Sequence, residues 1–240
     1  MTTWSEISDD PNSVAVLSSN QKTLDSSRQM QVENRTDYLV SLARGKKVLD
    51  IGVVEHSLDS VKSGRWLHRH LVESASSCVG LDVLENSVRA LQAEGYDVRV
   101  HDLTTTPLDE TFDLIVAGDV IEHVGGPQRL LEHARLSLAP GGRIVVTTPN
   151  PYMLHRAVHG LRGDFRDSAD HVALFGPSHM LELGHRAGLR LDRWRGVRLK
   201  TPTHVRGRAI AGLRRLVAST LLSSDVNCDT LIYEFVARFE

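Results

Sequence analysis

Short apolar runs alternate with helical patterns along most of this chain, and that alternation restricts the fold more than any other feature. The first run, 46–52, ends in Asp and Gly, as a buried parallel strand does. The spacing between runs leaves room for right-handed crossovers between parallel strands. We therefore predict an α/β fold with a doubly wound, mostly parallel, seven-stranded sheet. Strands are expected at 46–52, 77–81, 98–101, 112–117, 143–148, 189–197 and 231–239, and helices at 29–44, 65–74, 86–94, 127–138 and 178–187.

Composition agrees with a folded, soluble protein. Hydrophobic residues make up 41% of the 240 residues and charged residues 24%, which is enough apolar material for a core. No run of about 18 apolar residues occurs, so no transmembrane segment is expected. Residues 1–20 contain no Lys or Arg, whereas a signal peptide begins with a positively charged region, so this segment is a poor match to a signal peptide. Cys78 and Cys228 form no metal or disulfide pattern, so we expect a cytoplasmic protein without a metal.

The pattern predicts one domain over residues 29–240. Residues 1–28 are rich in Ser, Thr, Asn and Asp, which predicts a flexible leader or a lid. Two stretches, near 151–176 and 200–228, fall outside the strand and helix pattern. We expect them to be insertions that build an acceptor pocket together with the leader.

Ligands of doubly wound sheets bind beyond the carboxyl ends of the strands, so the residues that close the strands are the first candidates for a site. Asp82 closes the second strand and can accept both hydroxyls of a ribose; it also begins a D-x-x-E pattern typical of a helix capping box. Asp102 closes the third strand and can accept from the exocyclic amine of adenine, or cap its own loop. These signals indicate a nucleotide-type cofactor, which includes NAD.

The second half of the chain indicates which of the nucleotide-type cofactors to expect. The segment 112–124 reads FDLIVAGDVIEHV, and 138–146 reads LAPGGRIVV. Together they resemble the corresponding stretch of class I S-adenosylmethionine-dependent methyltransferases, and the resemblance runs from about Val48 to Asn150. It implies a Rossmann-like fold whose last strand is antiparallel, with S-adenosyl-L-methionine as the cofactor. The sequence TPNP at 148–151 is similar to a segment of methyltransferases that modify sugars and other polar small molecules.

The same resemblance implies roles for individual residues. Asp50 and Gly52 would lie beside the methionine part of the cofactor, and Asp82 would hold the ribose. Asp102 and Leu103 would flank the adenine. Gly118 and Asp119 would line the methionine and the point of methyl transfer. The full cofactor-binding set predicted here is Asp50, Gly52, Val53, Glu55, His56, Asp82, Val83, Asp102, Leu103, Gly118 and Asp119.

The first loop departs from the family pattern, which is usually Asp-x-Gly-x-Gly-x-Gly. Here Val54 and His56 stand at the second and third glycine positions, and a β-branched Val strongly disfavours a positive φ. We therefore expect the loop to follow another, longer path through 57–63, with Glu55 and His56 touching the carboxylate or amine of the cofactor. A similar DIG…H…WLH pattern is found in methyltransferases associated with glycan biosynthesis.

Two residues are candidates for the proton acceptor. His123 follows the fourth strand, and the usual pKa range of His suits a general base acting on a hydroxyl. A His bonded to a nearby backbone group is the structural alternative. Asp119 is the second candidate base. His155 and His159 do not form a zinc site of the H-E-x-x-H type, because Arg156 replaces the Glu.

We predict a methyltransferase that O-methylates a polar small molecule such as a sugar or glycan intermediate. One alternative is a non-catalytic methyltransferase-like binding or scaffold protein, which the altered first loop favours. The other is an NAD-dependent oxidoreductase, but no G-x-G-x-x-G and no Tyr-x-x-x-Lys pair occur. Oligomeric state is not readable from the sequence.

Charge bears on the acceptor. A net charge of −2 gives no reason to expect nucleic acid as a partner. Residues 155–215, however, contain 13 Lys and Arg against five Asp and Glu, which is either a solvated surface or a surface for an anionic partner. Within 205–222, four apolar residues share one helix face and four arginines lie close by. This segment is either a packing helix or one that binds phosphate, and we favour a phosphorylated acceptor over weak contact with a membrane surface.

Overall fold

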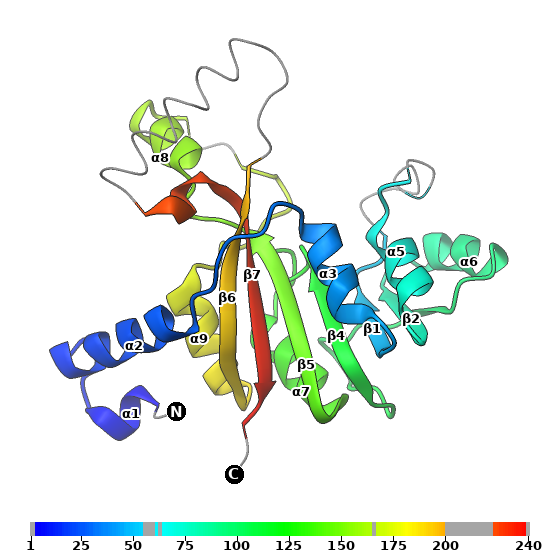
Figure 1. The fold of residues 1–240 in the computed structure, drawn as a ribbon, viewed down its shortest axis with the longest axis horizontal. Coiled ribbons are helices and arrows are strands. Elements are labelled where there is room, and N and C mark those ends of the chain that lie inside the picture. The colour runs from blue at the N-terminus through cyan, green and yellow to red at the C-terminus, as the bar shows by residue number, and fades with distance from the viewer. Residues whose placement is uncertain (1–2, 55–60, 62–63, 165–166, 200–222, 239–240) are drawn as a thin grey trace.

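The computed structural model describes residues 3–54, 61, 64–164, 167–199 and 223–238 (Figure 1). Its strands form one seven-stranded sheet of order β3-β2-β1-β4-β5-β7-β6. Strands β1 to β5 pair in parallel, whereas β7 runs antiparallel to both β5 and β6. This confirms the predicted α/β class and the antiparallel last strand. The strands are β1 Lys47–Ile51, β2 Ser77–Asp82, β3 Val98–Val100, β4 Phe112–Gly118, β5 Leu138–Pro149, β6 Leu189–Arg198 and β7 Cys228–Ala237.

Helices cover both faces of the sheet. Helices α3 (Arg35–Ala43) and α5 (Leu67–Ser74) pack on one face through buried apolar residues such as Leu39 and Leu71. Helices α7 (Pro127–Leu136) and α9 (Pro177–Arg186) pack on the other face, where Leu131 and Met180 join the larger core. The central strands are buried from both sides, which explains why β1 and β4 read as nearly continuous apolar runs.

Two helix starts differ from the sequence prediction. Helix α3 begins at Arg35 instead of residue 29, because the Asn34 side chain accepts from the backbone N–H of Thr36. The preceding residues extend along β6, where the N–H of Val32 donates to the carbonyl of Gly196 over 3.0 Å. Helix α6 (Glu85–Ala93) has Leu84 at its N-cap, so the capping box that could begin at Asp82 is not formed.

The leader contains helices that its composition did not predict. Helix α1 spans Trp4–Ile7 and α2 spans Val14–Ser27, and the Trp194 indole donates to the carbonyl of Leu24 over 2.8 Å. Figure 1 shows α2 lying beside β6 and α9. The leader is therefore docked on the domain by apolar packing and hydrogen bonds, and a role as a lid stays a prediction.

The carboxyl ends of the parallel strands point toward the end of the molecule that carries α8 (Leu154–Leu161) (Figure 1). This helix lies in the insertion near 151–176, and sequence analysis did not expect it. The short 3-10 helix η1 (Ser224–Asn227) precedes β7. The proposed basic helix at 205–222 lies outside the described residues. Among the described helices, none combines the length and the apolarity needed to cross a bilayer.

Candidate functional site

A cavity of about 690 Å³ opens at the carboxyl edge of the sheet, and its walls come from the ends of β1, β2 and β4 and the loops that follow. This volume lies within the range of small-molecule sites. Ten of the predicted site residues line it, although they are spread over much of the chain. They are Asp50, Gly52, Val53, Asp82, Val83, Asp102, Leu103, Gly118, Asp119 and His123. Glu55 and His56, the other two, lie outside the described residues.

Gly52 has a backbone that only glycine adopts without strain. Its φ is +77°, and a Cβ at this position would lie 2.3 Å from Cγ2 of Val120. Its N–H donates to the carbonyl of Leu81 over 2.8 Å, which joins the loop after β1 to the end of β2. A side chain at residue 52 would therefore fill the space where β1 and β4 approach the cavity.

Hydrogen bonds with two side chains fix the loop after β1, in which the glycines usual for the family are absent. The Val54 N–H donates to Oδ2 of Asp82 over 2.8 Å, and the indole N–H of Trp66 donates to the carbonyl of Val53 over 2.7 Å. Val54 is not among the described residues with positive φ, as its β-branched side chain requires. An aspartate and a tryptophan thus fix a backbone path that this chain does not build with glycines.

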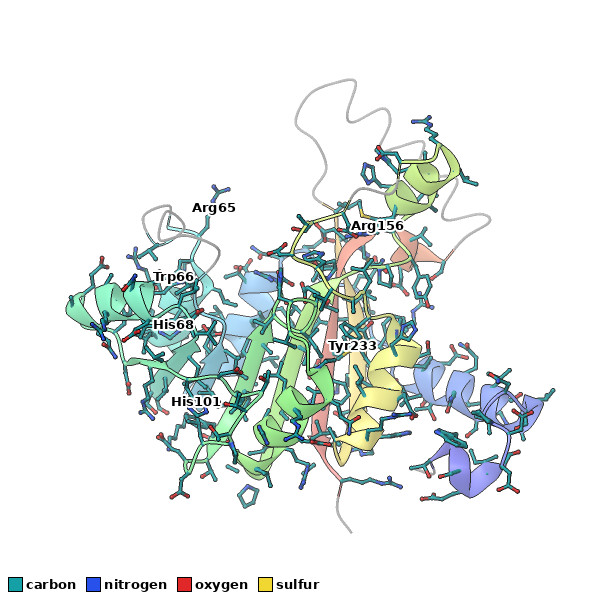
Figure 2. All side chains as sticks on the ribbon, turned by 180° about the vertical axis from the view of Figure 1, so that it is seen from behind. Arg65, Trp66, His68, His101, Arg156 and Tyr233 are labelled. Atoms are coloured by element: carbon teal, nitrogen blue, oxygen red, sulfur yellow. The ribbon has the colours of Figure 1, made fainter. Side chains whose placement is uncertain are left out.

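Asp50 forms a buried pair with His68, which sequence analysis did not select. The Nδ1 of His68 lies 3.0 Å from Oδ2 of Asp50, and both residues are buried and line the cavity. The Trp66 ring packs 5.1 Å from the His68 ring. In Figure 2, Trp66 and His68 lie close together on the β1–β2 side of the sheet, whereas Arg156 belongs to α8, at another part of the molecule. The sequence signal that could have identified His68 is the WLH segment at residues 66–68.

Asp82 and Asp102 both organise loops while lining the cavity. Oδ1 of Asp82 accepts from the N–H of Leu84 over 3.0 Å, in addition to the bond of Oδ2 with Val54. Oδ1 of Asp102 accepts from the N–H and the hydroxyl of Thr104 over 2.8 and 2.7 Å. The loop-capping interpretation of Asp102 is therefore correct. A carboxylate offers about four lone-pair sites, so ligand binding remains compatible with both residues.

Asp119 stands at the end of β4 with a φ of 54°, the one positive φ among the described residues other than glycine. Its carboxylate pairs with Arg35 of α3 and accepts from the hydroxyl of Thr147 over 2.9 Å. Arg35 also donates to the Thr147 hydroxyl over 3.2 Å and lines the cavity. Sequence analysis missed Arg35, because nothing local connects α3 with the end of β4.

His123 lies in the loop after β4 and meets a loop from the insertion near 151–176. Its Nδ1 is 3.2 Å from Oδ2 of Asp170 and 3.3 Å from the Asp170 carbonyl oxygen. The predicted structural alternative, a His bonded to a backbone group, thus fits the geometry as well as a base does. The His171 ring lies 4.8 Å from the His123 ring, and burial together with His123 lowers the pKa of His171.

Glu122 is the most unusual group at the site. Its side chain is fully buried, and burial raises the pKa of its carboxyl to about 7. Oε2 accepts from the Thr148 hydroxyl over 3.0 Å, whereas Oε1 has no hydrogen-bond partner. Sequence analysis quoted Glu122 only as part of a motif and gave it no role.

The comparisons with known proteins agree on the family. Residues 24–193 match the model of a family described as "Methyltransferase domain". The chain is 26% identical over 162 residues to the ubiquinone biosynthesis O-methyltransferase of Aeromonas salmonicida, covering 64% of this chain and 66% of that protein. It is 29% identical over 133 residues to the one of Pseudomonas entomophila, covering 50% and 53%. The matches thus span between about half and just under two thirds of these relatives.

Solved structures share the fold. Magnesium protoporphyrin IX methyltransferase from Synechocystis PCC 6803, solved with bound SAH, has a TM-score of 0.56 at 17% identity, covering 98% of this chain and 92% of that one. The N-methyltransferase NodS from Bradyrhizobium japonicum has a TM-score of 0.51 at 16% identity, with 85% and 95% covered. At these identities the likeness concerns the arrangement of strands and helices alone.

Proposed function

Since this chain belongs to the methyltransferase-domain family, that of the class I S-adenosylmethionine-dependent methyltransferases, we propose that it transfers a methyl group from S-adenosylmethionine to a hydroxyl of a small molecule. The observation that carries the proposal is the single cavity that collects the ends of β1, β2 and β4. In doubly wound sheets this is where nucleotide-type ligands bind.

The residues present fit the cofactor. Glycine at residue 52 leaves the backbone at the cavity without a side chain, because a Cβ there would collide with Val120, so a ligand could approach that backbone closely. Asp82 would accept from the ribose hydroxyls, and Asp102 with Leu103 would flank the adenine. Asp50, oriented by His68, would face the methionine ammonium, and Gly118 would leave room for the methionine chain. When bound, S-adenosylmethionine supplies a methyl group already activated by a positively charged sulfur.

The protein itself must align the acceptor hydroxyl with the methyl group and remove the proton of that hydroxyl. We assign the proton to His123, whose ring Asp170 orients through Nδ1. Asp119 already accepts from Arg35 and Thr147, which suits it better to orienting the acceptor than to taking a proton. Because alignment alone can supply several kcal/mol, roughly 7–11 at best, a site of this kind needs few catalytic groups.

The acceptor we propose is a polar hydroxyl compound, such as a sugar or glycan intermediate. The mouth of the cavity carries Arg35, Asp119, His123 and Asp170, which can hydrogen-bond several hydroxyls. A hydroxylated intermediate of ubiquinone biosynthesis is the second candidate, favoured by the names of the relatives. A phosphate on the acceptor stays a prediction, because the arginines at 206–215 lie outside the described residues.

Calorimetric titration tests the cofactor. S-adenosylmethionine and S-adenosylhomocysteine should bind with one site, and NAD should not. Asp82→Ala removes a charged acceptor and should weaken both by roughly ten- to hundred-fold, the equivalent of about 1.5–3 kcal/mol. Lack of binding at millimolar concentration would favour the scaffold alternative, and binding of NAD alone would favour the oxidoreductase.

Mass spectrometry tests the acceptor. Purified protein and S-adenosylmethionine are incubated with two panels, one of sugars and glycan intermediates and one of polyhydroxylated aromatic compounds. Addition of one methyl group to a hydroxyl, with matching formation of S-adenosylhomocysteine, is the expected result. Methylation confined to amines would contradict O-methylation while leaving the cofactor assignment intact.

A further inference from the structure

Three metal-binding side chains meet at the rim of the cavity. Glu122 and His123 follow β4, and His171 comes from the loop that precedes α9. One ligand atom from each lies within 4.8 Å of the other two. The loops are tied together by the Val172 N–H, which donates to the carbonyl of Glu122 over 2.8 Å. We propose that these three residues bind one divalent transition-metal ion.

The buried carboxyl of Glu122 points to a ligand independently of the cluster. Its exposure is 0%, and Oε1 has no hydrogen-bond partner. A buried carboxyl with an unsatisfied oxygen is costly unless a cation or donor reaches it. Arg35, a described cation that lowers the pKa of Glu122, is paired with Asp119. A metal ion on Oε1 would therefore satisfy an atom that the described residues leave without a partner.

The two histidines are prepared to act as ligands. The Nδ1 of His171 is buried and makes no hydrogen bond, although Oδ1 of Asp167 lies 3.4 Å from it in an ion-pair contact. Burial lowers the pKa of that imidazole, which favours the neutral form that a metal requires. Asp170 lies 3.2 Å from Nδ1 of His123. Such a carboxylate orients a metal-binding His through the nitrogen that does not bind the metal. This would make Nε2 the ligand atom of His123.

The geometry requires a contraction of the cluster. In tetrahedral or octahedral geometry, neighbouring ligand atoms about 2.1 Å from one ion lie about 3.0–3.4 Å apart, so atoms now up to 4.8 Å apart would approach by at most about 1.8 Å through side-chain rotation. Two imidazoles and one carboxylate favour zinc, iron, cobalt or manganese over magnesium or calcium, which prefer oxygen ligands. Among the described residues, the carboxylates beside the cluster are Asp119, Asp167 and Asp170. Arg35 pairs with Asp119 and Arg156 pairs with Asp167, so each of these arginines has an acidic partner of its own.

The ion would have a role toward the acceptor, and this part of the proposal rests on the proposed function. All three ligands line the cavity, so the remaining coordination positions would face the acceptor. A hydroxyl oxygen bound there would be oriented and would lose its proton more readily. With the ion bound, His123 would act as a ligand instead of as the base, and the proton would pass to Asp119, the second candidate base. Sequence analysis predicted no metal, because His171 is far from His123 in the chain and no spacing pattern connects them.

The experiment measures metal binding without any reaction. The untagged full-length chain is treated with a chelator, dialysed and titrated with Co²⁺ and Zn²⁺ by calorimetry and, for Co²⁺, by visible absorption. Glu122→Gln and His171→Gln remove one ligand each while keeping the side-chain size close. His70→Gln is the matched control, since it removes an imidazole of α5 whose ring faces the Gly64 carbonyl, outside the cavity. Circular dichroism confirms that each variant is folded.

We expect one Co²⁺ or Zn²⁺ per chain, a Co²⁺ spectrum typical of nitrogen and oxygen ligands, and at least a ten-fold loss of affinity in both ligand variants. His70→Gln should bind as the wild type does, and Mg²⁺ should compete poorly. The proposal is overturned if millimolar Co²⁺ and Zn²⁺ give no saturable signal, or if both ligand variants bind like the wild type. S-adenosylhomocysteine titrated into the same samples tests the proposed function separately.

Discussion

The two sides of the cavity are built differently. The floor, formed by Asp50, Gly52, Asp82 and Asp102 at the ends of β1 to β3, has each carboxylate bonded to a donor of the chain. The rim is formed by Asp119, Glu122, His123, Asp170 and His171, and Oε1 of its buried carboxyl, Glu122, has no hydrogen bond. Unsatisfied imidazole nitrogens occur on both sides, at Nδ1 of His171, which lies 3.4 Å from Asp167, and at Nε2 of His68. Buried carboxyl oxygens normally have partners, so the bare Oε1 of Glu122 distinguishes the rim from the floor, whose carboxylates are all bonded.

This difference supports the proposal that the floor binds the cofactor and that the rim carries out catalysis. The floor is fixed before any ligand arrives, which suits a cofactor that is bound in one pose. The rim combines a positive φ at Asp119 with unsatisfied atoms on two loops. Strain and incomplete pairing of this kind persist at sites whose geometry serves catalysis. Substitutions on the rim should therefore change turnover, and substitutions on the floor should change cofactor affinity.

The largest expected effect is on the rim. His123→Ala removes the assigned proton acceptor, and kcat should fall roughly 10²–10⁴-fold, the range of general base catalysis. The affinity for S-adenosylhomocysteine should change little, because His123 does not belong to the floor. Steady-state kinetics with the identified acceptor and calorimetry with S-adenosylhomocysteine give the two values. A loss of less than ten-fold in kcat would leave His123 with only a structural role, and Asp119→Asn then tests the second candidate.

On the floor, Gly52→Ala should remove cofactor binding. The new Cβ would lie 2.3 Å from Val120 and would strain a backbone of φ +77°. We expect at least about a hundred-fold weaker binding of S-adenosylhomocysteine, the equivalent of the ~3 kcal/mol that overpacking can cost. Gly45→Ala is the matched control, because Gly45 has a similar φ of +67° with no atom within 4 Å of the new Cβ. Equal loss of binding in both variants would mean that strain, and not the collision, is responsible.

Much of the floor could be predicted from the sequence, and much of the rim could not. Asp50, Asp82 and Asp102 close apolar runs, and the ends of parallel strands meet at one edge, so local patterns locate them. Arg35 and His171 reach the site from α3 and from a loop of the insertion, and no local pattern reports such tertiary contacts. The leader shows the same limit. Its polar composition predicted flexibility, whereas helix α2 docks there through buried residues such as Val16 and Leu24.

A smaller effect sharpens the role of the Asp50–His68 pair. His68→Phe keeps a ring beside Trp66 and loses the bond of Nδ1 with Oδ2 of Asp50. If His68 orients Asp50 toward the amino-acid part of the cofactor, S-adenosylhomocysteine should bind about ten-fold more weakly, as expected for a lost bond to a charged group. Binding of 5′-methylthioadenosine, which lacks the amino-acid part, should not change. A similar loss for both ligands would show that His68 only supports the fold.

The smallest effect concerns an imidazole that resembles His171 but lies on α9, away from the cavity. His185 also has a buried nitrogen without a hydrogen bond, and burial, aided by Arg238, lowers its pKa. Between that lowered pKa and the ordinary value near 6.5, the unfolded chain binds more protons than the folded chain. Stability should therefore fall as the pH drops below about 6.5 and be unaffected by this group above pH 7.

Thermal melts between pH 5 and pH 8 measure this dependence. His185→Gln should melt with a weaker dependence on pH below 6.5. The difference should be a fraction of the ~1.4 kcal/mol per pH unit that one proton can contribute, because the side chain is only partly buried. Cofactor and metal affinities at pH 7.5 should match the wild type. If the variant instead loses metal or cofactor affinity, His185 influences the cavity from α9, and the assignment of binding to the floor and the rim alone fails.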